Sequence, residues 1–159
     1  MMAQAANKRV DRASRLLNAS PQAIYRAFVD QQALAAWLPP EGMRGEILAF
    51  EPREGGAFEM ALTYKEAGQG HGKTSENAEM VKGRFGEMVP ERRIVWLVQF
   101  ESDDPKFAGT MRMTWEFLPV AGGTEVTIRA EDVPVGISPE DHDEGLRSSL
   151  NGLARAVEV

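Results

Sequence analysis

The fold is indicated most clearly by the last stretch of the chain, SPEDHDEGLRSSLNGLARAVEV, residues 138–159. It opens with Ser138-Pro139, an N-cap residue followed by proline at the first helical position, and Asp141 stands three places after the cap, as in a capping box. Apolar residues then recur at helical spacing and form one stripe: Leu146, Leu150, Leu153 and Val157. The pattern predicts one long amphipathic helix that ends at about Glu158.

The middle of the chain, from about residue 44, has a period of two instead. Alternating apolar and polar positions are typical of half-buried antiparallel strands. The apolar faces are Phe58, Met60, Leu62 and Tyr64; Ile94, Trp96, Val98 and Phe100; Met111, Met113, Trp115 and Phe117; and Val126 and Ile128. Turn-forming residues separate these runs at 52–56, 68–72, 90–91, 103–105 and 122–123. We therefore predict an antiparallel meander.

The N-terminal part is predicted to contain a strand over residues 9–18 and then two short helices. Ser20-Pro21 marks the start of the first helix, and Pro39-Pro40 stops the second one after Trp37. The order of strand, helix pair, meander and long helix favours a curved sheet closed around one helix. Such an arrangement encloses an interior cavity.

Composition limits the class of protein. The chain has 159 residues, 43% of them hydrophobic, which fits one compact domain over residues 1–159 with a flexible N-terminus at 1–8. It has no apolar run of roughly 18 residues and no signal-peptide core, so we expect a cytoplasmic protein without a membrane span. The net charge of −6 comes without a basic stripe, which argues against nucleic acid as a partner. Zero cysteines exclude disulfides and thiolate chemistry.

Two local patterns resemble functional motifs but are better explained otherwise. Residues 67–74, AGQGHGKT, match a relaxed phosphate-loop spacing, but residues 77–89 have the pattern of a strand and not of the helix that such a loop needs. We predict a mobile hairpin loop there, which contains His71. The other histidine, His142, lies among carboxylates in the first turn of the last helix and is predicted to be solvated. We expect neither a metal site nor a cofactor.

A row of small residues runs beside the apolar stripe of the last helix: Gly145, Ser149, Gly152 and Ala156. Each glycine inside a helix costs roughly 1 kcal/mol relative to alanine. The row is explained either by close approach of the helix to the sheet or by space left under the helix for a ligand.

Several segments together resemble one known family. They are FVDQQALAAWLP (28–39), GGAF (55–58), GRF (83–85), PERRI (90–94), GTEV (123–126) and Gly145-Leu146. In this order they resemble the START-like (SRPBCC) superfamily, in the branch of homologues of the heat-shock-protein ATPase activator. The resemblance implies an α+β helix-grip fold: a seven-stranded curved antiparallel sheet wrapped on a long C-terminal helix, with two short helices after the first strand. Family members commonly carry Trp where this chain has Leu146, and this difference bears on the shape of the cavity.

The predicted cavity leads to three functional hypotheses. Its lining, inferred from alternation and from the last helix, is Trp37 near the mouth with Phe58, Met60, Tyr64, Phe85, Trp96, Phe100, Met111, Met113, Trp115, Leu146 and Leu150. We expect a binding site for a small hydrophobic or amphipathic molecule, with Tyr64 and Trp96 as the first candidates for polar contacts. The alternatives are an enzyme of the cyclase, dehydratase or hydrolase type, and a protein-interaction or co-chaperone module of the stress response. Inward apolar residues that simply form the core, and a homodimer, stay open as well.

Overall fold

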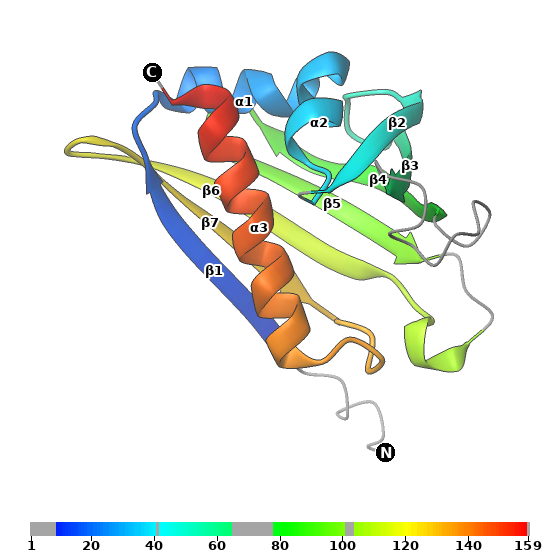
Figure 1. Ribbon diagram of the computed structural model, residues 1–159. Helices are drawn as coiled ribbons and strands as arrows, with labels where there is room; N and C mark the ends of the chain where they lie inside the picture. The colour runs from blue at the N-terminus through cyan, green and yellow to red at the C-terminus, as the bar shows by residue number, and fades with distance from the viewer. Residues whose placement is uncertain (1–8, 41, 65–77, 101–103, 159) are drawn as a thin grey trace.

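The computed structural model describes residues 9–40, 42–64, 78–100 and 104–158, so residues 1–8 and the phosphate-loop-like stretch 67–74 with His71 lie outside the described residues. Within these described ranges the chain forms three α-helices, a short 3-10 helix and one sheet (Figure 1). The helices are α1 (Pro21–Val29), α2 (Gln31–Trp37), η3 (Pro105–Phe107) and α3 (Pro139–Val157). The strands are β1 (Val10–Leu17), β2 (Met43–Phe50), β3 (Ala57–Tyr64), β4 (Ala78–Val89), β5 (Arg93–Phe100), β6 (Met111–Val120) and β7 (Gly123–Glu131).

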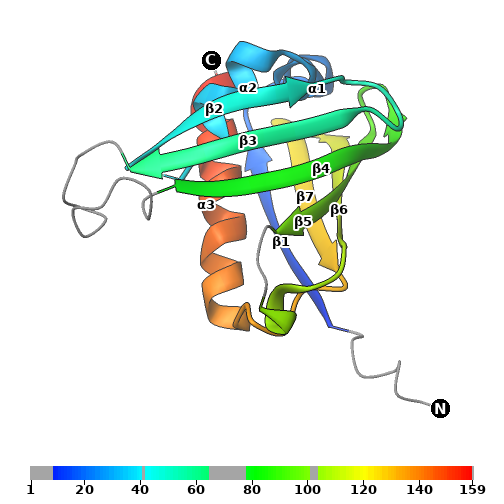
Figure 2. The ribbon, with the colours of Figure 1, turned by 90° about the vertical axis from the view of Figure 1, so that its right-hand side faces the viewer.

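The sheet confirms the predicted meander. Its strand order is β1-β7-β6-β5-β4-β3-β2, and the neighbouring pairs are antiparallel. Strands β2 to β7 follow one another in chain order, and β1 joins the far edge beside β7. The sheet curves so strongly that β2, β3 and β4 run across the direction of β1, β6 and β7 (Figure 2). Helix α3 lies along the concave face, which is the helix-grip arrangement (Figure 1).

The helices begin where the capping residues predict. The Ser20 hydroxyl accepts a hydrogen bond from the backbone N–H of Ala23 at 3.1 Å, and the Ser138 hydroxyl accepts one from Asp141 at 3.1 Å. Asp30 separates the two short helices and caps α2 by accepting from the N–H of Ala33 at 3.1 Å. Among the described residues, no helix has the length and apolar character needed to cross a membrane.

An aromatic cluster joins the short helices to the sheet. The Phe28 ring of α1 lies with its centroid 5.0 Å from Trp37, 5.7 Å from Trp96 and 4.9 Å from Trp115. The Trp37 indole N–H donates to the carbonyl of Ala27 at 2.9 Å. Trp37 is therefore a core residue between α1, α2 and the sheet, and not the cavity-mouth residue that we expected.

The small-residue row of α3 has two different surroundings. A Cβ on Gly152 would lie 2.3 Å from the carbonyl oxygen of Trp37, so this glycine lets α3 approach α2. A Cβ on Gly145 would meet nothing within 4 Å. The close approach that we predicted is therefore made to a neighbouring helix instead of the sheet, and it is made at Gly152 and not at Gly145.

Candidate ligand-binding cavity

A cavity of about 230 Å³ lies between the N-terminal half of α3 and strands β3 to β6. Most of the predicted lining borders it: Phe58, Met60, Trp96, Phe100, Met111, Met113, Trp115 and Leu146. Gly145 and Ser149 of the small-residue row also border it, and the wall is completed by residues that the sequence did not single out for this role: Leu38, Pro40, Leu62, Val81, Val98 and His142. The strands supply apolar side chains from one face, as alternation requires. The arrangement suits an apolar or amphipathic guest.

Three of the predicted lining residues are buried elsewhere. Trp37 and Leu150 are buried in the core and do not border this space, and Phe85 packs with its ring centroid 5.9 Å from that of Phe50. The side chain of Tyr64, one of the two first candidates for polar contacts, lies outside the described residues. Alternation predicts the inward face of a strand, but position along the strand decides whether a side chain meets another element or the cavity.

The size of the cavity limits what it holds. Protein cavities of about 150 Å³ bind benzene, whereas drug-sized ligands occupy roughly 300–1,000 Å³. A space of about 230 Å³ therefore fits one aromatic ring with a substituent, or a short acyl chain. Met60, Met111 and Met113 line it, and their unbranched side chains adapt to guests of different shape.

Two buried indole groups give the apolar wall unused polar atoms. Trp96 is 2% exposed and Trp115 is fully buried, and both border the cavity. Neither indole N–H has a hydrogen-bond acceptor among the described residues. A buried donor without a partner costs about 1–3 kcal/mol. The two tryptophans of this wall therefore carry buried hydrogen-bond donors without a partner among the described residues.

His142 on the cavity wall is not the solvated residue that we predicted. Its Nδ1 lies 2.7 Å from Oδ2 of Asp11 in β1, and the two side chains are only 10% and 12% exposed. Arg9 holds the same carboxylate through Nη2 at 2.8 Å. Burial by itself raises the pKa of the Asp11 carboxyl, but hydrogen bonds from Arg9 and His142, together with their charges, outweigh it and hold that pKa below its usual value. The contact between His142 and Asp11 therefore links the first turn of α3 to β1.

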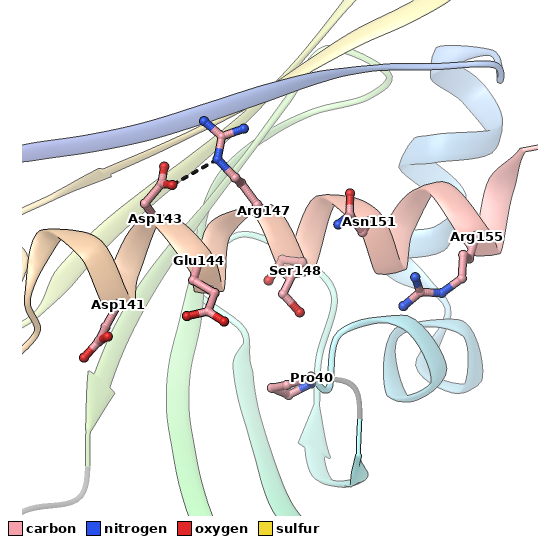
Figure 3. A pocket seen from close by; sticks show the side chains of 10 residues that line it. Pro40, Asp141, Asp143, Glu144, Arg147, Ser148, Asn151 and Arg155 are labelled. Carbon is pink, nitrogen blue, oxygen red and sulfur yellow. Dashed lines mark hydrogen bonds and ion pairs between the residues drawn. The ribbon is translucent and has the colours of Figure 1, made fainter.

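A second, larger space of about 830 Å³ lies on the outer side of α3 (Figure 3). Glu144 and Ser148 point from the helix toward the side where Pro40 lies, whereas Asp143 and Arg147 pair at 3.0 Å on the opposite side. This groove is polar and shares Pro40, Gly145 and Ser149 with the cavity. The cavity therefore meets the groove between Pro40 and the small residues of α3.

Sequence reasoning missed the pairing of Asp11 with His142. A signal was present, because Arg9 and Asp11 are two residues apart in the predicted strand 9–18 and should share a face with Ala13, which is buried. Charged residues on an inward face need a partner.

The described residues contain no group of three or more His, Cys, Asp or Glu side chains that could hold a metal ion.

Comparison with solved structures shows the same fold in bacterial proteins. A crystal structure of a Chromobacterium violaceum protein is 37% identical, with a TM-score of 0.81, and the match covers 94% of this chain and 97% of that one. A Rhodobacter sphaeroides protein is 20% identical, with a TM-score of 0.72 and coverage of 91% and 88%. The solution structure of the AHSA1-like protein from Aeromonas hydrophila is 15% identical, with a TM-score of 0.73 and coverage of 93% and 91%.

A protein-family model matches nearly the whole chain. No curated protein sequence matches it. The family model described as "Activator of Hsp90 ATPase homolog 1-like protein" matches residues 18–158, which extend from the end of β1 through α3. The match agrees with the START-like resemblance of the sequence, and the chain belongs to this family of Activator of Hsp90 ATPase homolog 1-like proteins.

Proposed function

We propose that this protein binds a small hydrophobic or amphipathic molecule in the cavity between α3 and strands β3 to β6. The observation that carries the proposal is an apolar space of about 230 Å³ that the side chains leave unfilled. Well-packed interiors contain few voids larger than a water molecule. A space of this size lowers stability unless a guest fills it, because its lining loses contacts.

The two unpaired indole N–H groups support the same proposal. An apolar pocket with a few polar groups is the usual form of a small-molecule site. The family description does not by itself assign a co-chaperone activity, because one fold hosts many functions. A protein-interaction module would be expected to have a filled core and an apolar patch on its outer surface. In this chain the apolar surface that carries the proposal is the wall of the cavity.

The test is a thermal-shift and NMR titration of the full chain with toluene and a panel of single-ring aromatics and short-chain alcohols. At a ligand concentration of 100 Kd, a single site raises the free energy of unfolding by about 2.7 kcal/mol, or roughly 5–10 °C in Tm. We expect saturable stabilisation by at least one member of the panel. No shift and no NMR perturbation with any of them would contradict the proposal.

A cavity-filling variant locates the site. Leu146 borders the cavity and is 2% exposed, so Leu146→Trp is expected to occupy the space and abolish binding. Leu118→Trp is the matched control, because Leu118 is 57% exposed in β6 and does not border the cavity. Unchanged binding in Leu146→Trp would place the guest elsewhere. If this variant does not fold, Met113→Ala enlarges the same space and is expected to admit a two-ring compound such as naphthalene.

A further inference from the structure

We propose that His142, oriented by Asp11, is a hydrogen-bond acceptor on the cavity wall that selects small ring compounds carrying a hydroxyl group. The inference rests on the binding function proposed above and names the chemical class of its ligand. Among the described residues that line the cavity, His142 is the one with an ionisable side chain.

Asp11 decides which imidazole nitrogen carries the proton. The pKa of its carboxyl is held low, so Asp11 is ionised near neutral pH and can only accept hydrogen bonds. Nδ1 of His142, 2.7 Å from Oδ2, must therefore be the donor. In the neutral imidazole this leaves Nε2 with a lone pair, as an acceptor. No described residue donates a hydrogen bond to Nε2.

The pair is held in place from both sides. Nε of Arg9 lies 3.1 Å from Oδ1 and 3.2 Å from Oδ2 of Asp11, and Nη2 lies 2.8 Å from Oδ2. This fork-shaped contact balances the charge of the carboxylate and fixes its orientation. His142 itself stands in the first turn of α3, whose start is capped by Ser138. The imidazole is thus oriented before any ligand enters.

The surroundings favour a hydroxyl group over a carboxylate. Glu140, Asp141, Asp143 and Glu144 share the first turns of α3 with His142. These carboxylates disfavour a second anion near Nε2. The apolar wall accepts a ring, and the volume accepts one ring with a substituent. A phenol or a ring alcohol meets these conditions, since its O–H donates to Nε2 and its oxygen can still accept.

The test compares toluene, anisole and p-cresol as probes of the full chain at about pH 8, where the phenol of p-cresol is not ionised. Anisole and p-cresol are isomers, but only p-cresol donates a hydrogen bond. We expect the ratio of their affinities to fall by about five- to tenfold in His142→Phe, which loses the acceptor. Comparing ratios between variants cancels the different hydration of the two probes.

Two further variants separate orientation from charge. In Asp11→Asn the amide can donate to Nδ1, which moves the imidazole proton to Nε2, so the preference for p-cresol is expected to fall there too. Asp141→Asn makes the same charge change at an exposed carboxylate one residue before His142 and should leave the ratio unchanged.

Imidazole ¹⁵N NMR tests the tautomer without a ligand. The chain has two histidines, and the signals of His142 are identified as those that disappear in His142→Phe. If His142→Phe does not fold, they are identified as those that shift in Asp11→Asn. A proton on Nε2 in the free protein would overturn the inference. So would an unchanged affinity ratio in His142→Phe while toluene still binds. Failure of every probe to bind the unmodified protein would instead overturn the proposed function, and the inference with it.

Discussion

Gly145 and Gly152 stand in the same helix, and their surroundings differ. The Cβ position of Gly152 is 2.3 Å from the backbone oxygen of Trp37, which leaves no room for a side chain. The Cβ position of Gly145 faces open space where the cavity meets the outer groove. Sequence predicts the same helix cost for both residues, about 1 kcal/mol each. Only the neighbours decide which glycine is required.

The two glycines therefore predict opposite effects of the same substitution. Gly145→Ala is expected to raise the free energy of unfolding by about 0.5–1 kcal/mol, because it removes the helix cost and meets no atom. Gly152→Ala is expected to lower it by about 1–3 kcal/mol, because the methyl group pushes α3 from α2. Urea denaturation of both variants checks this. Equal effects of the same sign would contradict it.

At the scale of elements, the contact between β1 and α3 holds the first strand and the last helix together. Besides Asp11 and His142, Arg15 donates to the side chain of Asn151, and Glu158 accepts from the backbone N–H of Asn18 at 3.0 Å. Asp11 and Arg15 alternate with outward residues along β1, so the strand presents them on one face. The first strand and the last helix are thus joined by polar contacts along their length.

This contact predicts how stability depends on acid. The pKa of Asp11 is lower in the folded chain than its ordinary value of 3.8, so folding favours the ionised form. The ionised Asp11 carboxylate contributes to the free energy of unfolding above about pH 3.8, and this contribution is lost as the pH falls through the lower pKa of the folded state. The difference in unfolding free energy between the unmodified chain and Asp11→Asn should shrink below about pH 4.

Chemical denaturation at a series of pH values measures that difference. Asp141→Asn serves as the control, since it removes an exposed carboxylate in the same turn of α3. A difference for Asp11→Asn that persists undiminished at the lowest pH would show that the ionised carboxylate is not what stabilises the contact.

At the scale of the whole molecule, one aromatic cluster supports both the core and the cavity. Phe28 contacts Trp96 and Trp115, and these two rings also border the cavity. The centroids of Trp96 and Trp115 are 5.4 Å apart. Contacts of this kind add about 0.5–1.5 kcal/mol beyond the area that they bury. The rings that anchor α1 to the sheet therefore also form part of the cavity wall.

Phe28→Ala tests this role. Phe28 is fully buried, so its truncation is expected to lower the free energy of unfolding by about 3–5 kcal/mol, or roughly 6–20 °C in Tm. Leu118→Ala, at an exposed position in β6, should change the free energy of unfolding by less than about 0.5 kcal/mol. Differential scanning calorimetry compares the two. A small effect of Phe28→Ala would mean that the cluster relaxes around the missing ring.

The sequence by itself determined the elements, their order and the inward face of each strand. These properties follow from local rules: a period of two in strands, a period of 3.6 in α3, and capping residues such as Ser20 and Ser138. The family resemblance then supplied the topology, and the observed strand order agrees with it. Local patterns suffice here because every connection between β2 and β7 joins strands that are neighbours in the sheet.

Only the tertiary structure decided which inward residues meet a neighbour and which meet empty space. Phe85 follows the same period of two as Trp96 and Met113, but Phe85 packs against other core residues, whereas Trp96 and Met113 border the cavity. The pairing of Asp11 with His142 joins residues 131 positions apart, which no local period can report. A cavity exists where the curved sheet stands too far from α3 for side chains to fill the gap, and that separation is a property of the packed molecule and not of any one segment.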